Sequence, residues 1–363
     1  MYAMSLHPSV RRPSRGLRIS AMLVAFCVPL SACSGGSSGV QPEMPDPPDP
    51  PARPVPCVFA NATCAERVAL GDGLFLPAYT THLLTARHAD VTSGLIVVHG
   101  NTRDADNYFD TGLLAVTGSG GTLGNTLVVA PHFQTSDDDP GSDEPFWSSA
   151  GWKRGHLSRP EGPTPRVSSY AALDRILQLL LDANRFPALR QVVVAGHSAG
   201  GQVVHRYAAS SGEENEARTG VQFRYVVTNP STYLYLGPER ANGDGTFGVP
   251  GAGCDDYDDW HYGLRDRPSY PNAVDADTIR DRLVRRDVRI LLGDADTLSA
   301  SLDVSCGANL LGANRFVRGR TLVRFMAAFD SANAHTEMIV PGVGHSSRSM
   351  WTSEVGRGAL FGN

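Results

Sequence analysis

The sequence lacks the residue patterns of several common functional sites. Its cysteines and histidines do not show the spacing of a zinc site, and it contains neither a Walker loop nor a dinucleotide-binding glycine pattern. Internal repeats are absent as well. The acidic runs at residues 137–139 and 255–259 do not have the spacing of an EF-hand loop, so we interpret them as solvated loop charge. We therefore predict neither a metal nor a cofactor.

Positive charge and long apolar runs are also scarce. The formal net charge is −5, and removal of the four arginines that precede residue 33 takes it to about −9. This acidic balance argues against a nucleic-acid partner. The apolar run from Ile19 to Leu30 is too short to span a bilayer as a permanent helix. Because it follows a basic region at residues 11–18, it predicts an export signal over residues 1–32.

The end of this signal favours a lipid anchor. Cleavage after Ala32 by the ordinary signal peptidase would place bulky Leu30 where a small residue is preferred, whereas Leu30-Ser31-Ala32-Cys33 resembles a bacterial lipobox. Cys33 is therefore the predicted lipid attachment site, and simple secretion is the alternative. We expect an exported protein anchored to the cell envelope, at the outer membrane if the host has one, with no other membrane contact.

Residues 34–56 are rich in Gly and Ser and then in Pro and Asp, with almost nothing to bury. We predict that residues 33–56 form the anchor and a disordered tether. Residues 57–363 are then one domain. Once Cys27 leaves with the signal and Cys33 carries lipid, four cysteines remain, which allow three pairings in an oxidising compartment. Short spacing favours Cys57 with Cys64 and leaves Cys254 with Cys306; free thiols are the alternative.

The most informative motif is Gly196-His197-Ser198-Ala199-Gly200. It follows the apolar run at residues 192–195 and opens a segment that can be helical, which is the context of a nucleophile elbow. Such a sharp turn needs small residues two before and two after the serine, and Gly196 and Gly200 supply them. Ser198 is the predicted nucleophile. An ordinary glycine-rich turn between a strand and a helix is the alternative.

An acid and a base follow in the chain order serine, acid, histidine. The buried run at residues 290–293 leads to Asp294, Asp296 and Asp303, and a glycine-rich loop leads to His345. Histidine suits the base because its unperturbed pKa of about 6.5 lets it exchange protons near neutrality. We predict His345 as the base and Asp296 as the acid, since a residue three places beyond the strand reaches the loop; Asp294 and then Asp303 are the alternatives.

The run at residues 95–98 ends in His99-Gly100-Asn101, which is the usual entry to an oxyanion loop. Backbone N–H groups there and after the nucleophile would face the oxygen that becomes negative in a tetrahedral intermediate. We assign Asn101 and Ala199, with Thr102 as the alternative to Asn101. His99 and His197 are interpreted as structural residues that brace the loop and the elbow.

From about residue 70 onward these motifs resemble those of a secreted bacterial serine α/β-hydrolase. The resemblance implies esterase-like acyl transfer through a Ser/His/Asp triad, acting on a small-molecule or polymeric ester. A peptidase or amidase with the same triad is the alternative, and a surface-binding lipoprotein that keeps the fold without catalysis is a third. The sequence does not determine the oligomeric state.

The coarse pattern of elements predicts the matching architecture, a mostly parallel sheet with helices on both faces. Strands are expected near 93–99, 126–130, 191–195, 222–228, 287–292 and 336–340, and helices near 104–116, 167–184, 199–210, 276–286, 313–329 and 347–360. Residues 131–166 and 234–275 do not fit this alternation. We expect them to form a lid and cleft whose aromatic side chains either line an apolar site or pack within their own loops: Phe133, Phe146, Trp147, Trp152, Tyr233, Tyr235, Trp260 and Tyr262.

Overall fold

A computed structural model describes Arg53 and residues 55–362. The predicted export signal, the predicted lipid site Cys33 and most of the predicted tether lie outside the described residues. Among the described helices, none combines the length and the apolar character needed to cross a membrane.

In the described residues, eight strands form one sheet in the order β1-β2-β4-β3-β5-β6-β9-β10. The first pairings, β1 with β2 and β2 with β4, are antiparallel, and all the others are parallel. The strands are β1 (Ala65–Gly71), β2 (Leu74–Thr80), β3 (Ser93–Val98), β4 (Thr126–Pro131), β5 (Gln191–His197), β6 (Gln222–Thr228), β9 (Val288–Gly293) and β10 (Thr336–Val340). Two short strands, β7 (Arg240–Ala241) and β8 (Phe247–Gly248), pair separately.

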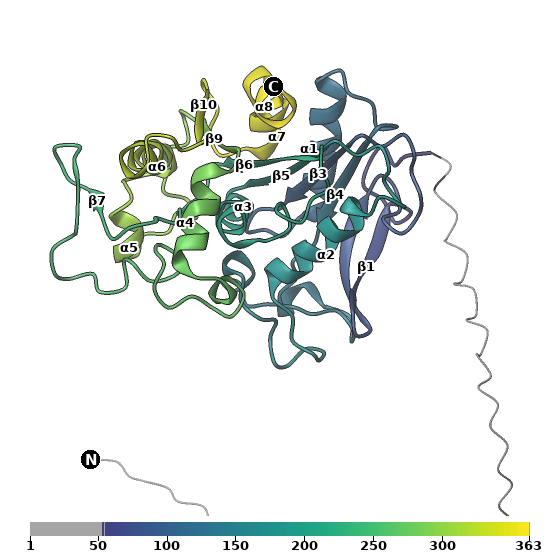
Figure 1. Cartoon of the computed structure of the whole chain (residues 1–363), viewed down its shortest axis with the longest axis horizontal. Helices are drawn as coiled ribbons and strands as arrows, with labels where there is room; N and C mark the ends of the chain where they lie inside the picture. The colour runs from purple at the N-terminus through teal and green to yellow at the C-terminus, as the bar shows by residue number, and fades with distance from the viewer. Residues whose placement is uncertain (1–52, 54, 363) are drawn as a thin grey trace, which may run out of the picture. The chain divides into compact units, whose positions relative to one another are not determined.

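Helices cover both faces of this sheet (Figure 1). They are α1 (Ala105–Gly118), α2 (Ser169–Leu181), α3 (Ala199–Ser210), α4 (Ala276–Arg285), α5 (Cys306–Asn309), α6 (Arg315–Phe329), α7 (Ser347–Thr352) and α8 (Glu354–Phe361). Short 3₁₀ turns are η1 (Ser136–Asp138), η2 (Trp152–Arg154) and η3 (Pro271–Ala273).

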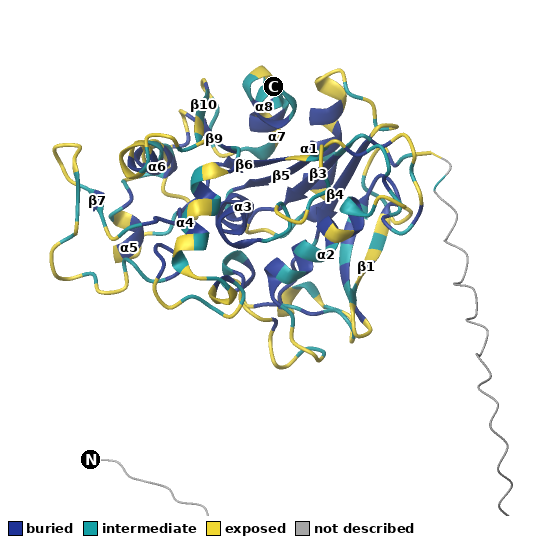
Figure 2. Cartoon of the chain, in the orientation of Figure 1, coloured by how far each residue is buried: buried dark blue, intermediate teal, exposed yellow. Residues whose placement is uncertain are grey.

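The central strands are apolar throughout because both of their faces are covered. Successive side chains of a strand point to opposite faces. In β5, Val192 and Val194 pack in a cluster with residues of α2, α3, α4 and α6, while Val193 and Ala195 pack in a second cluster with residues of α1, α7 and α8. Figure 2 shows the resulting buried strands between helices whose outer surfaces are exposed. The sheet is thus a rigid support for the loops at its carboxyl edge.

The expected strands and helices are present, with four differences, one of which is the short β7–β8 pair within residues 234–275. An antiparallel hairpin, β1 and β2, precedes the first expected strand. The helix expected near 347–360 is divided into α7 and α8 at Ser353, whose hydroxyl accepts from the Gly356 N–H at 2.9 Å and caps α8. A short helix, α5, begins at Cys306 in the long loop after β9.

Two disulfides join the cysteine pairs that the spacing favours. Cys57 bonds Cys64, and Cys254 bonds Cys306. Disulfides are typical of proteins in an oxidising compartment. The second bond ties the 234–275 segment to α5, at the end of the loop that follows Asp296.

We expect peptide mapping of exported protein under non-reducing conditions to recover Cys57–Cys64 and Cys254–Cys306 as linked peptides. Closing the longer loop should stabilise the domain by about 4 kcal/mol through the entropy of the unfolded chain. Replacing both Cys254 and Cys306 with Ser should therefore lower the melting temperature clearly, measured by calorimetry. Free thiols at these positions in fresh material would contradict the pairing.

Candidate active site

Ser198 lies at a sharp turn between β5 and α3. Its backbone has φ 59° and ψ −118°, which is unusual for a residue other than glycine, and its N–H donates to the Thr228 carbonyl at 2.9 Å. A Cβ on Gly196 would lie 2.3 Å from the Gly200 backbone, and one on Gly200 would lie 2.1 Å from the Val98 carbonyl oxygen. Only glycine fits at both positions, so the motif's spacing is required by the close approach of β5, α3 and β3.

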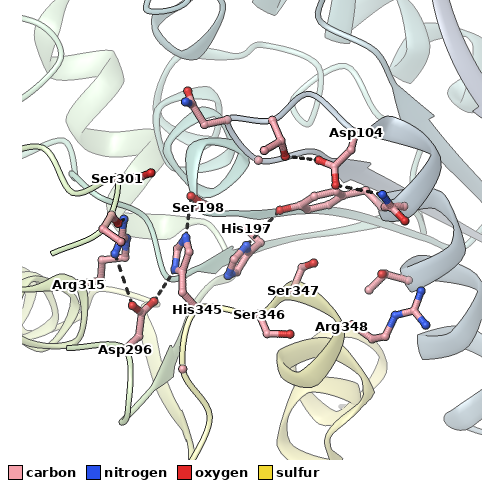
Figure 3. A pocket seen from close by; sticks show the side chains of 18 of the residues that line it. Asp104, His197, Ser198, Asp296, Ser301, Arg315, His345, Ser346, Ser347 and Arg348 are labelled. Carbon is pink, nitrogen blue, oxygen red and sulfur yellow. Dashed lines mark hydrogen bonds and ion pairs between the residues drawn. The ribbon is translucent and has the colours of Figure 1, made fainter. Parts of the chain in front are cut away.

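Ser198, His345 and Asp296 form a continuous chain of hydrogen bonds (Figure 3). The Ser198 Oγ lies 2.9 Å from His345 Nε2, and His345 Nδ1 lies 2.6 Å from Asp296 Oδ2. An ionised carboxylate can only accept, so Nδ1 carries the proton and Nε2 accepts from the serine hydroxyl. Asp296 is 1% exposed, whereas Ser198 remains accessible from a cavity. This geometry suits removal of the serine proton by His345.

The two alternative acids have other partners. Asp294 is exposed, and its Oδ1 accepts from the Gly342 N–H at 2.6 Å on the loop that leads to His345. Asp303 accepts from the Tyr262 hydroxyl at 2.8 Å. Burial alone would raise the pKa of Asp303, but the imidazole of His261 at 3.8 Å and hydrogen bonds from Ser305 and Tyr262 lower it. Neither carboxylate contacts the imidazole of His345, so the structure brings only Asp296 to the histidine.

The loop after β3 places Gly100, Asn101 and Thr102 in the wall of the same cavity as Ser198. Ala199 is the first residue of α3, where N–H groups have no partner within the helix. The positions of Asn101 and Ala199 thus suit the predicted oxyanion donors, with Thr102 next to Asn101.

His99 is buried beneath this loop. Its Nε2 accepts from the Phe133 N–H at 3.0 Å, so Nδ1 carries the proton and donates to the Gly100 carbonyl at 2.9 Å. Burial lowers the pKa of His99 to about 3, so the ring is neutral. It connects the loop after β3 to the segment after β4.

His197 is also buried, and its Nδ1 lies 3.1 Å from the Tyr108 hydroxyl. Burial lowers the pKa of His197 well below the usual value, and His345 and Arg315 act in the same direction. The ring is thus neutral, and it packs 4.5 Å from the ring of His345. Both histidines occupy bracing positions under the site.

Three residues that the sequence analysis did not single out contact the site. Tyr108 of α1 lies against His197 and the cavity wall. Lys153 of η2 donates to the Asn101 side-chain oxygen at 3.1 Å, and burial lowers the pKa of Lys153 to about 8. Arg315 of α6 lies beside Asp296. Tyr108 lies seven residues after Asn101 but contacts His197 through the fold, and Lys153 and Arg315 come from segments outside the motifs, so no local pattern identifies these contacts.

The cavity at Ser198 has a volume of about 520 Å³. Residues of the segments 100–111, 295–301 and 344–348 line it, and the side chains are mostly polar, among them Asn101, Thr102, Asp104, Asn107, Ser301 and Arg348. None of the aromatic residues expected to line an apolar cleft takes part. Phe133, Trp147, Trp152, Tyr233 and Tyr235 are fully buried, while Trp260 and Tyr262 border a different cavity of about 400 Å³ with Arg154 and Asp303. The fully buried aromatic residues instead pack in the core against other elements, where Tyr233 contacts His205 of α3 and Tyr235 contacts Phe325 of α6.

No metal-binding cluster is present in the described part of the chain: no three His, Cys, Asp or Glu side chains lie close enough together to hold an ion.

The fold is similar to that of solved hydrolases. No protein-family model matches the chain, and no curated protein matches it in sequence. Poly(aspartic acid) hydrolase-1 from Sphingomonas sp. KT-1 superposes with a TM-score of 0.55 at 22% identity, covering 79% of this chain and 94% of that one. LpqC, a poly(3-hydroxybutyrate) depolymerase from Bordetella parapertussis, gives 0.54 at 22% identity, covering 79% and 86%. The chain has the α/β-hydrolase fold. In this chain, as in open parallel sheets generally, the cavity lies at the carboxyl edge of the strands.

Proposed function

We propose that this protein is a serine hydrolase that cleaves carboxylic esters through an acyl-enzyme. The observation that carries the proposal is the chain of hydrogen bonds from Ser198 through His345 to Asp296, with the serine held at positive φ at the mouth of a cavity. A surface-binding protein without catalysis would not need an accessible serine in this conformation, because such backbone strain costs free energy.

The proposed reaction uses each of these groups. His345 Nε2 takes the proton as the Ser198 Oγ attacks the ester carbonyl carbon, and the Asn101 and Ala199 N–H groups stabilise the resulting oxyanion. His345 then gives the proton to the departing alcohol, which leaves the acyl group on Ser198. A water molecule, deprotonated by the same imidazole, attacks the acyl carbonyl, and the bond to the Ser198 Oγ breaks. The imidazolium returns the proton to this Oγ as the carboxylic acid leaves.

The lining of the cavity favours a short acyl group. A long fatty acyl chain needs a wide apolar channel, whereas Leu298 is the only large aliphatic side chain among the described residues that line this cavity. We therefore propose a short ester. The structural neighbours include a hydrolase and a depolymerase that are named for polymers. This supports testing an oligomeric ester besides small soluble ones.

A fluorophosphonate probe followed by a substrate panel tests the proposal. The wild-type protein should be labelled at Ser198 and should cleave p-nitrophenyl acetate and butyrate faster than the palmitate. If the matched p-nitroanilides are cleaved faster than these esters, the protein is an amidase or peptidase and not an esterase. Absence of both labelling and turnover in folded protein would favour the binding alternative.

We also propose that Cys33 carries a lipid, a site outside the described residues. Cys33→Ser should abolish labelling by a fatty-acid analogue and block processing of the precursor, followed by gel shift and mass spectrometry. Turnover of a short soluble ester should remain within about twofold, because the 33–56 segment contributes no catalytic group. Normal processing of the variant with unchanged lipid labelling would contradict the anchor.

A further inference from the structure

Arg315 lies beside the carboxylate that holds the histidine. It is the first residue of α6, and its Nη1 is 3.5 Å from Asp296 Oδ1, the oxygen that does not bond His345. Both side chains are 1% exposed. Figure 3 shows Asp296 between Arg315 on one side and His345 on the other.

The same guanidinium also binds the cavity wall. Its Nη1 donates to the Leu298 carbonyl at 3.3 Å and its Nη2 to the Ala300 carbonyl at 2.7 Å. Leu298, Ala300 and Ser301 line the cavity at Ser198. Arg315 thus joins the acid of the triad to one wall of the proposed substrate site.

We propose that Arg315 is a positioning residue that sets the pH range of the reaction through Asp296 and fixes the 298–301 wall for the substrate. The inference rests on the proposed function. A buried guanidinium next to Asp296 shares the negative charge that would otherwise act on His345 alone. Asp296 then stabilises the imidazolium form of His345 less than it would without Arg315. The neutral imidazole, which acts as the base, therefore persists to lower pH than in a triad without this arginine.

The other charged and titratable groups near His345 do not contact Asp296. From β5, His197 is buried and neutral. From α7, Arg348 borders the cavity, and from the loop before α1, Asp104 does so on the opposite wall. Asp294 is turned toward the Gly342 N–H, and the Tyr108 hydroxyl toward His197. None of these groups contacts Asp296, and among the described residues its only ionic partner besides His345 is Arg315.

The test compares pH–rate profiles of the full-length protein and three variants. Arg315→Met removes the charge and the carbonyl contacts, and Arg315→Lys keeps the charge but not the two-carbonyl bridge. Arg320→Met is the matched control, since Arg320 lies on the same helix with its side chain 55% exposed and paired to Glu337. Thermal melts establish which variants are folded, and Arg315→Gln replaces the methionine variant if that one does not fold.

We expect the neutral variants to move the acid-limb midpoint of kcat/KM up by about one pH unit, which is a tenfold loss of activity below the midpoint. Arg315→Lys should keep the midpoint within about 0.3 unit while KM rises several-fold. Arg320→Met should change neither.

Two results would overturn the inference. One is an unchanged midpoint in a folded neutral variant, which would reduce Arg315 to a structural contact. The other is an equal shift in Arg315→Lys, which would show that charge is not the cause. A wild-type protein without esterase activity would instead count against the proposed function, so the two failures are distinguishable.

Discussion

Ser198→Ala is expected to lower kcat by about 10⁴- to 10⁶-fold. The substitution removes the one oxygen that forms the covalent bond, while alanine keeps the Cβ in the tight turn between β5 and α3. The fold should be nearly unaffected, because the Ser198 hydroxyl bonds only His345. Turnover of p-nitrophenyl acetate under saturating conditions measures the effect, and a thermal melt checks the fold.

Ser301→Ala is the matched control for this experiment. Ser301 lines the same cavity but takes no part in the hydrogen-bonded chain, so its loss should change turnover by less than about tenfold. Residual activity of the Ser198 variant within tenfold of the wild type would remove Ser198 from the mechanism. Fluorophosphonate labelling should disappear in the same variant and remain in the control.

Much of the fold can be predicted because its determinants are local. Apolar runs such as residues 192–195 and 290–293 become central strands. Gly196 and Gly200 fit a turn in which the neighbouring backbones approach too closely for any side chain. The chain order of serine, acid and histidine then follows from the order of the strand ends. The choice of Asp296 over Asp294 depended on one further argument, the reach of the loop, and the contact with His345 agrees with it.

The hairpin of β1 and β2 was accessible from the sequence but was not predicted. Asp72-Gly73 separates two segments in which Val68, Leu74 and Leu76 are buried, and both turn residues have positive φ, as the tight turn of a hairpin requires. The expected strands began near residue 93, because a half-exposed edge strand such as β1 has a weaker apolar pattern.

Other features depend on contacts between distant segments. Lys153 reaches Asn101 across 52 residues, and Arg315 reaches Asp296 from the start of α6. A lysine or an arginine in a loop or helix is usually a surface residue, so sequence alone does not single these out. The roles of the aromatic residues in 131–166 and 234–275 were also not predictable. Composition alone does not distinguish aromatic side chains of the core from those of a binding site.

Asp296→Asn is expected to lower kcat by about 10³- to 10⁴-fold. The carboxylate accepts a hydrogen bond from the His345 Nδ1–H at 2.6 Å, which keeps the proton on Nδ1 and leaves Nε2 free to take the serine proton. A neutral amide gives up the charge that stabilises the imidazolium and can present an N–H to Nδ1, which favours the wrong tautomer. The loss should therefore appear in kcat more than in KM, measured by steady-state turnover.

Asp294→Asn is the matched control, two residues away and after the same strand. It removes a charge that accepts from the Gly342 N–H but does not reach His345, so its effect on kcat should be less than about tenfold. Asp296→Asn should also lower the melting temperature, because the Arg315 guanidinium would remain buried without its ionic partner. A larger loss of turnover in Asp294→Asn than in Asp296→Asn would transfer the acid to Asp294, and it would leave the buried Asp296–Arg315 pair as a purely structural contact.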